Sequence, residues 1–95
     1  DQAYAREQWA KVGAERDRVT RELTTRGFDV IPSRGNFVLA TLPGARYAKP
    51  VYEGMKARGV LVRFFDNPGL NDKLRITIGT HDENTRMLVA LDASL

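Results

Sequence analysis

Apolar residues recur along the first quarter of the chain at the spacing of a helix face. Between residues 4 and 26 they fall three or four positions apart, at Ala5, Trp9, Val12, Val19 and Leu23, which places them on one side of a helix. Arg16 interrupts this stripe. Gly27 follows, and glycine accepts the left-handed backbone that commonly ends a helix. We therefore predict a helix about 30 Å long at residues 4–26.

The pattern then changes to short apolar runs, which predict four strands at residues 28–31, 36–41, 60–64 and 74–78. Alternation in the fourth strand separates Leu74, Ile76 and Ile78 from Arg75 and Thr77. We expect the helix-covered face of the sheet to combine Phe37, Leu39, Ile76 and Ile78. The opposite face should then carry Asn36, Val38, Arg75 and Thr77.

Two further helices are predicted, at residues 48–58 and 81–93. Pro50 suits the first turn of the former helix, and Gly59 ends it. Thr80 and Glu83 form a capping-box pattern at the start of the latter helix. The apolar residues expected to face the sheet are Val51, Tyr52, Met55, Met87, Leu88 and Leu91.

The element order α-β-β-α-β-β-α predicts an α+β fold. We expect a two-layer sandwich, a small mixed or antiparallel sheet of three to four strands with helices on one face, preceded by the long helix. So long a helix in so small a chain is typical of a connection between two bodies. Residues 1–26 are therefore interpreted as an interdomain helix and residues 27–95 as an α/β sandwich that belongs to a larger protein. The strand order stays open.

Composition narrows the function classes. The 95 residues contain no cysteine, which excludes disulfides, cysteine nucleophiles and cysteine metal sites and is compatible with the cytoplasm. The 15 basic and 12 acidic residues are spread along the chain, unlike the charge blocks of nucleic-acid-binding tails. Its apolar runs are far shorter than a membrane span. We expect no nucleic-acid or membrane partner and no bound metal.

Arg75 and Arg63 are the main candidates for a binding site. Each lies among apolar residues of a predicted strand, where a guanidinium is costly to desolvate unless an anion meets it. A guanidinium also binds carboxylate or phosphate through two donors at once. The alternative for Arg75 is a solvated arginine or one paired within the domain. For Arg63 it is a surface arginine at a strand end, which sequence alone favours. Two arginines separated by one loop can nevertheless converge on one dianionic group.

Asn36 and His81 are weaker candidates. Asn36 opens the second strand, where it either binds a ligand or caps the local turn, and sequence alone favours the turn. His81, at the start of the last helix, is interpreted as an exposed residue because no catalytic partner lies at a suitable spacing.

Four ordered blocks of this sequence resemble a known family. The blocks are Phe28-Asp29-Val30-Ile31-Pro32-Ser33, Asn36-Phe37-Val38-Leu39, Gly59-Val60-Leu61-Val62-Arg63 and Leu74-Arg75-Ile76-Thr77-Ile78-Gly79-Thr80. They are similar to the C-terminal part of the histidinol-phosphate aminotransferases, which are fold type I pyridoxal-phosphate-dependent enzymes. The resemblance extends over nearly the whole chain.

The resemblance implies that this chain is the small domain of a cytoplasmic, homodimeric transferase. That enzyme would exchange an amino group between histidinol phosphate and 2-oxoglutarate or glutamate in histidine biosynthesis. Arg75 would bind the substrate's anionic group, Arg63 would help to hold its phosphate, and Asn36 would line the cleft.

The chain departs from the family in the residues that hold the cofactor. Lys11, Lys49, Lys56 and Lys73 match no Schiff-base motif. Pyridoxal 5'-phosphate would therefore be bound by the large domain, and we expect no catalytic residue in this chain and no activity from it alone. Three alternatives remain: a related threonine-phosphate decarboxylase, another class I/II aminotransferase, and a stand-alone anion-binding or regulatory module without chemistry.

Overall fold

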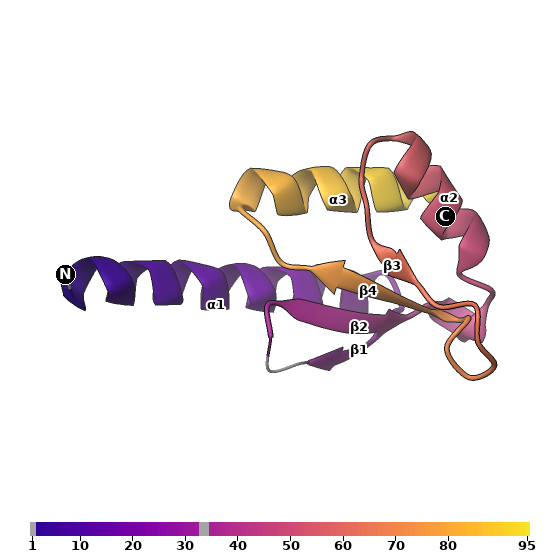
Figure 1. The fold of residues 1–95 in the computed structure, drawn as a ribbon, viewed down its shortest axis with the longest axis horizontal. Coiled ribbons are helices and arrows are strands. Elements are labelled where there is room, and N and C mark those ends of the chain that lie inside the picture. Colours follow the sequence, from indigo (N-terminus) through magenta and orange to yellow (C-terminus); the bar gives the residue numbers. More distant parts are fainter. Residues whose placement is uncertain (1, 33–34) are drawn as a thin grey trace.

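The structure, a computed structural model, describes residues 2–32 and 35–95, with side chains described from residue 13 onward except at Pro32. Within these ranges the elements follow the order that the sequence predicts (Figure 1). Their bounds are α1 (Gln2–Thr25), β1 (Asp29–Pro32), β2 (Phe37–Thr41), the short 3₁₀ turn η1 (Pro43–Ala45), α2 (Lys49–Ala57), β3 (Arg63–Phe64), β4 (Lys73–Thr77) and α3 (His81–Ser94).

The strands form one antiparallel sheet in the order β1-β2-β4-β3. Helix α1 contacts β1 and β2, α2 contacts β3, and α3 contacts both other helices. The helices thus form one layer, in the order α1-α3-α2, over one face of the sheet (Figure 1). The predicted two-layer α+β sandwich is confirmed, and its sheet is antiparallel rather than mixed.

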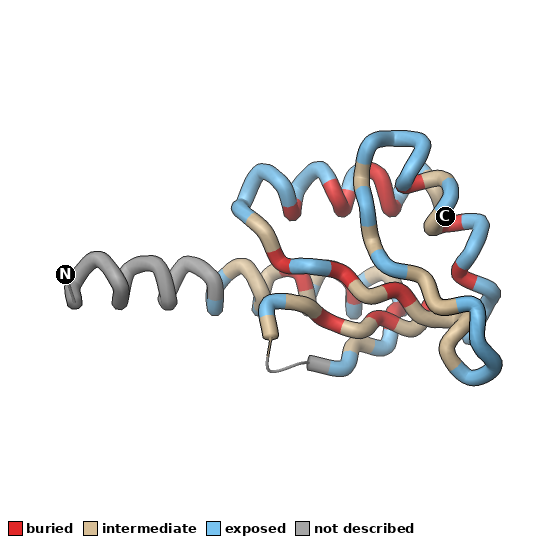
Figure 2. The backbone as a smooth tube through the Cα atoms, viewed as in Figure 1, coloured by how far each residue is buried: buried red, intermediate tan, exposed pale blue. Residues whose placement is uncertain are grey.

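One hydrophobic core lies between the sheet and the helix layer (Figure 2). Val19 and Leu23 of α1 are fully buried in it, which confirms the end of the predicted apolar stripe. The side chains of Ala5, Trp9 and Val12 lie outside the described residues. The other two helices contribute Val51, Met55, Met87, Leu88, Ala90 and Leu91.

The sheet side of the core confirms one predicted strand face and corrects another. Leu74, Ile76 and Ile78 are buried as predicted, but their partners from β2 are Val38 and Ala40. Phe37 and Leu39 are only half-buried and lie on the opposite face. The prediction for β2 was wrong because residues 37–40 are apolar on both faces, so alternation alone could not choose between them. The register decides it, because Val38 pairs with Ile76 and paired residues share a face.

Strand β3 is shorter than predicted, because only Arg63 and Phe64 pair with β4. The chain leaves α2 through a tight turn in which the backbone N–H of Val60 donates to Met55 O at 3.0 Å. Val60 and Val62 then pack against the core. This packing draws residues 60–62 toward the helix layer, and the β3–β4 ladder opens beyond Arg63.

The end of β4 leads directly into α3. Thr80 accepts a hydrogen bond from the backbone N–H of Glu83, and the Glu83 carboxylate accepts one from the N–H of Thr80, so the predicted capping box is confirmed. These bonds also lower the pKa of Glu83.

Gly54 of α2 lies so close to Ser94 of α3 that a Cβ at this position would meet the Ser94 hydroxyl at 2.7 Å. A glycine here lets the two helices approach closely.

None of the helices among the described residues has the combination of length and apolar character that a bilayer crossing requires.

Candidate anion-binding site

The sheet face opposite the helix layer carries a row of paired residues. Ile31 pairs with Leu39, Leu39 with Arg75, and Arg75 with Arg63, across all four strands. Phe37 and Thr77 form the neighbouring pair on the same face. We call the surface formed by Ile31, Phe37, Leu39, Arg63, Arg75 and Thr77 the open face. The structure therefore brings the two candidate arginines together as direct cross-strand partners.

The pairing of Arg63 with Arg75 places two positive charges opposite each other. Like charges at directly opposed strand positions destabilise a sheet. Among the described residues, neither guanidinium donates a hydrogen bond to an oxygen or lies within ion-pair distance of a carboxylate. Such an arrangement leaves the forked donors of both side chains available to an external anion.

Each arginine instead lies over an aromatic ring. The Cζ atom of Arg75 is 4.3 Å from the centre of the Phe37 ring, and that of Arg63 is 5.3 Å from the centre of the Phe65 ring. A ring face attracts a cation without neutralising it. Arg75 is half-buried and Arg63 is exposed. The site thus combines one partly desolvated cation with one at the rim.

Asn36 does not share the open face with Arg75. The β2–β4 ladder continues past β2, where the N–H of Ile78 donates to Asn36 O at 2.6 Å. Because Ile78 is buried under the helices, alternation puts Asn36 in phase with Val38 and Ile78 rather than with Arg75. Its side chain is exposed at the end of the sheet. The placement of Asn36 on the same face as Arg75 was therefore incorrect.

The described lysines do not provide a site for a Schiff base. Lys49 and Lys56 are exposed on α2. Lys73 donates to the Thr41 hydroxyl at 3.0 Å and lies 3.3 Å from Asp72, so its amine is already engaged. A Schiff-base lysine needs an uncommitted amine in a shielded pocket. These residues do not fit a covalently held cofactor.

A groove of about 260 Å³ lies where β3 and β4 separate. It is lined by residues 59–62, by Ile76, Thr77 and Gly79, and by the first turns of α3. Neither Arg63 nor Arg75 lines it. The arginine pair therefore lies outside this groove.

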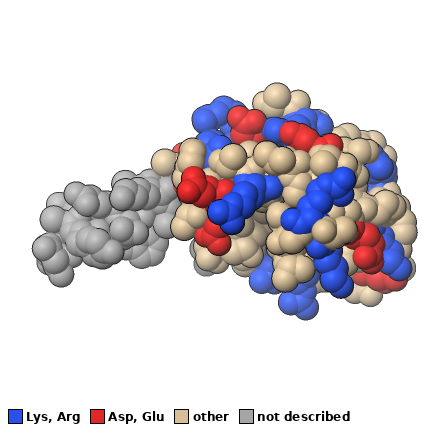
Figure 3. Space-filling model, turned by 90° about the horizontal axis from the view of Figure 1, so that it is seen from above, with Lys and Arg blue, Asp and Glu red and all other residues tan. Residues whose placement is uncertain are grey.

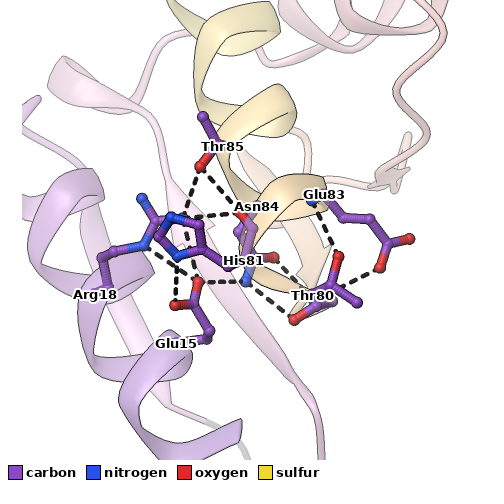
Figure 4. Close-up of polar contacts among 8 residues, drawn as sticks. Glu15, Arg18, Thr80, His81, Glu83, Asn84 and Thr85 are labelled. Carbon is purple, nitrogen blue, oxygen red and sulfur yellow. Dashed lines mark hydrogen bonds and ion pairs between the residues drawn. The ribbon is translucent and has the colours of Figure 1, made fainter. Parts of the chain in front are cut away.

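A network of polar contacts lies where α1 meets α3 (Figure 4). Glu15 of α1 is 2.9 Å from His81 Nδ1 and accepts hydrogen bonds from Asn84 at 3.1 Å and Arg18 at 3.2 Å. We call Glu15, Arg18, His81, Asn84 and Thr85 the polar cluster. Its bonds, led by the one to His81, lower the pKa of Glu15 to about 2.

Sequence reasoning missed the polar cluster. His81 is exposed at the first residue of α3, as predicted, but its contact with Glu15 joins positions 66 residues apart. Glu15 and Arg18 are three residues apart on one helix, which is the one local signal that the sequence offered. Asn84 is the buried polar residue at the centre, 1% exposed, and it also bonds both the N–H and the C=O of Gly79.

Comparison with known proteins identifies the family. Residues 1–91 match the family described as aminotransferase class I and II. The chain belongs to this family. Histidinol-phosphate aminotransferase 1 of Trichormus variabilis is 46% identical over 96% of this chain, and the aligned part is 26% of that protein. The chain spans about a quarter of the length of the curated relatives it matches.

Solved structures agree with this assignment. The histidinol-phosphate aminotransferase of Clostridium acetobutylicum matches 98% of this chain with a TM-score of 0.83 and 29% identity, over 29% of its own length. The enzyme of Sinorhizobium meliloti, solved in complex with pyridoxal-5'-phosphate, matches 99% of this chain with a TM-score of 0.81 and 28% identity, over 26% of its own length. The family resemblance in the four sequence blocks is thus confirmed.

Proposed function

We propose that this chain is the substrate-binding small domain of a pyridoxal-phosphate-dependent aminotransferase that transfers an amino group between histidinol phosphate and 2-oxoglutarate. Its role is to hold the anionic groups of these substrates, while the cofactor is held by a large domain of the same protein. The family depends on pyridoxal phosphate, which supplies the electron sink for amino transfer. Similarity to histidinol-phosphate aminotransferases over nearly the whole chain supports the choice of substrate.

The observation that carries the proposal is the arginine pair on the open face. Arg63 and Arg75 are cross-strand partners, lack a carboxylate partner among the described residues, and each lie over a phenylalanine ring. A sheet gains nothing in stability from two opposed cations. A substrate carboxylate or phosphate would relieve their repulsion and fill their donor positions. We assign the main contact to Arg75, which is half-buried, and a supporting contact to Arg63.

The remaining parts of the proposal concern the protein around this domain. We propose that residues 1–26, which include α1, connect the large domain to residues 27–95, with the end of α1 packed into the helix layer of the sandwich. The open face then lies toward the cofactor cleft, with Asn36 at its margin. We further propose a cytoplasmic homodimer that takes part in histidine biosynthesis.

The test of anion binding uses the 95-residue chain, whose core is continuous among its described residues. Isothermal titration compares histidinol phosphate, histidinol without its phosphate, and glutamate. This separates recognition of the anionic group from recognition of the imidazole ring of the ligand. Arg75→Gln should weaken binding of histidinol phosphate at least tenfold, a loss of about 1.4 kcal/mol or more, as expected for charge-assisted bonds. Arg63→Gln should weaken it about threefold to tenfold, a loss of about 0.7–1.4 kcal/mol, because Arg63 is exposed. Arg21→Gln is the matched control, because Arg21 is an exposed arginine on α1.

Equal binding by wild type and Arg75→Gln would disprove the assigned site.

The activity itself is tested on the native polypeptide from its source cells, and the intact mass of that polypeptide is measured. Amino transfer from glutamate, with release of 2-oxoglutarate, is expected. Release of carbon dioxide instead would indicate a decarboxylase. A native mass near 10.7 kDa would favour a stand-alone anion-binding module.

A further inference from the structure

Phe37, on the open face, contacts the Arg75 guanidinium. Phe37 pairs with Thr77, and Arg75 is two residues before Thr77 on the same face. Phe37 and Arg75 are therefore diagonal neighbours, within reach of each other across the strands. The Arg75 guanidinium lies over the Phe37 ring at 4.3 Å. This contact is 1.0 Å shorter than the corresponding contact of Arg63, at 5.3 Å.

The Phe37 ring also lies close against the backbone of Gly35. A Cβ atom added to Gly35 would lie 2.9 Å from Cε1 of the ring and 3.1 Å from Cδ1. Gly35 is not among the glycines with a positive φ, so the backbone does not demand glycine there. The space that glycine leaves is occupied by the ring. The identity of residue 35 therefore fixes where the ring of residue 37 can lie.

The position of Gly35 is itself tied to the first helix. The guanidinium of Arg16, on α1, donates to the Gly35 carbonyl oxygen. This accounts for the arginine that interrupts the apolar stripe of α1: it reaches from the helix to the turn before β2. Contacts thus run from Arg16 to Gly35, from Gly35 to Phe37, and from Phe37 to Arg75.

Arg63 also lies over a phenylalanine ring, that of Phe65, but at a longer distance than Arg75 from Phe37. Phe65, under Arg63, follows β3 at the start of a loop, and Arg63 is exposed whereas Arg75 is half-buried. The two stacks therefore differ in how firmly each ring is held. A guanidinium over a ring keeps the donors along its edge free for an anion, and a fixed ring also fixes the direction of those donors.

We propose that Phe37 is a positioning residue for anion binding, and that Gly35 acts with it by leaving room for its ring. Phe37 holds the Arg75 guanidinium in the orientation that receives the substrate anion, so that the ordering of this side chain is complete before binding. This inference rests on the proposed function of Arg75. It adds two residues, neither of which contacts the anion.

The experiment measures binding of inorganic phosphate and the NMR signal of the Arg75 Nε–Hε group in the 95-residue chain. Phe37→Leu should weaken phosphate binding about fivefold to tenfold and remove the ring-current shift of the Arg75 Hε signal. Phe37→Tyr keeps the aromatic face and should retain both. Phe65→Leu is the comparison variant, with an expected loss of less than threefold and an unchanged Arg75 signal.

Gly35→Ala tests whether the space at residue 35 sets the position of the Phe37 ring. Its added methyl group should displace the ring, weaken phosphate binding severalfold and move the Arg75 Hε signal. In the Phe37→Leu background the same change should add little, because no ring remains to be displaced. Gly13→Ala is the matched control, since a Cβ there meets nothing within 4 Å and phosphate binding should be unchanged.

The outcomes separate this inference from the proposed function. Phosphate affinity within twofold of wild type in Phe37→Leu, together with loss of binding in Arg75→Gln, would overturn the role of Phe37 and leave the site intact. Unchanged binding in Arg75→Gln would overturn both. An Arg75 Hε signal that does not move in Phe37→Leu would show that the ring does not hold the guanidinium, and would overturn the inference whatever the affinities.

Discussion

The polar cluster between α1 and α3 and the open face of the sheet both contain arginines. The arginine of the polar cluster is paired with a carboxylate, whereas those of the open face are not paired with one among the described residues. In the polar cluster, Arg18 contacts Glu15 and also donates to Thr85 and to the carbonyl of His81. Further along the same pair of helices, Arg26 makes a two-pronged contact with Asp92 at 2.6 and 2.9 Å and a second contact with Glu22. On the open face, Arg63 and Arg75 face each other without a carboxylate partner among the described residues.

The difference separates stabilising charges from binding charges. Hydrogen bonds to Asp92 and then to Glu22 raise the pKa of Arg26 above its usual range, and the bond to Arg26 lowers the pKa of Asp92. These groups tie α1 to α3. Seen from above the view of Figure 1, basic and acidic side chains are interspersed on the surface (Figure 3). A cation left without such a partner on a sheet face has its binding capacity available for a ligand.

The largest loss of stability is expected in the polar cluster at Asn84. Asn84→Ala would leave the N–H and C=O of Gly79 without their side-chain partner at a buried position, and would remove one hydrogen bond to Glu15, which keeps its contact with Arg18. Leaving buried groups unsatisfied costs about 1–3 kcal/mol or more. We expect a fall of about 2–3 kcal/mol in the free energy of unfolding, measured by urea denaturation.

The control for Asn84→Ala is Asn67→Ala, in an exposed loop, which should change stability by less than about 0.5 kcal/mol. Phosphate affinity per folded molecule should stay unchanged in Asn84→Ala, because the cluster is not part of the open face. A loss of stability no larger than that of the control would mean that water replaces the Asn84 contacts.

A smaller, pH-dependent effect is expected at Glu15. Its pKa falls from 4.5 to about 2 in the folded chain, so the unfolded state binds a proton first as the pH decreases. The contribution of Glu15 to stability is therefore complete above pH 4.5 and is lost as the pH falls toward 2. Glu15→Gln removes this titration, and its free energy of unfolding should change less than that of wild type between pH 5 and 2.

The measured quantity is the difference in free energy of unfolding between wild type and Glu15→Gln at each pH. Glu83 and Asp92 also have lowered pKa values and give both proteins a common acid dependence. His81, Arg18 and Asn84 face Glu15 from α1 and α3, and they remain in the variant. Parallel stability curves over this pH range would contradict the assigned role of Glu15.

These two regions also differ in how far the sequence predicts them. The Thr80–Glu83 capping box is local, and the alternation of residues 74–78 is unambiguous, so helix α3 and the faces of β4 were predicted correctly. Proximity of Arg63 and Arg75 was anticipated from one intervening loop. The polar cluster was not predicted, because Asn84 and Glu15 are 69 residues apart and meet only after the helices pack.

The errors have a common physical cause. Residues 37–40 are apolar on both faces, so the face of β2 is chosen by its register with β4 and not by its own pattern. Residues 60–62 have strand-forming composition, but packing of Val60 and Val62 on the core competes with pairing to β4. Local propensity is overridden wherever tertiary packing offers a better alternative.

The smallest effect on stability is expected where the charges are unpaired. Arg63→Gln and Arg75→Gln each remove one of two opposed cations together with its contact to a phenylalanine ring. The relief of repulsion and the loss of the ring contact have opposite signs and similar sizes of about 0.5 kcal/mol. We therefore expect the free energy of unfolding to change by less than about 0.5 kcal/mol in either variant.

Phosphate sharpens this last comparison. A ligand that binds the folded chain adds about 1.4 kcal/mol to its stability at ten times the dissociation constant, so wild type should gain this amount while Arg75→Gln gains little. Arg21→Gln should behave as wild type, because it leaves the open face intact. A loss of more than 1 kcal/mol in Arg75→Gln without phosphate would mean that Arg75 supports the sheet itself, and the division between stabilising and binding arginines would not hold.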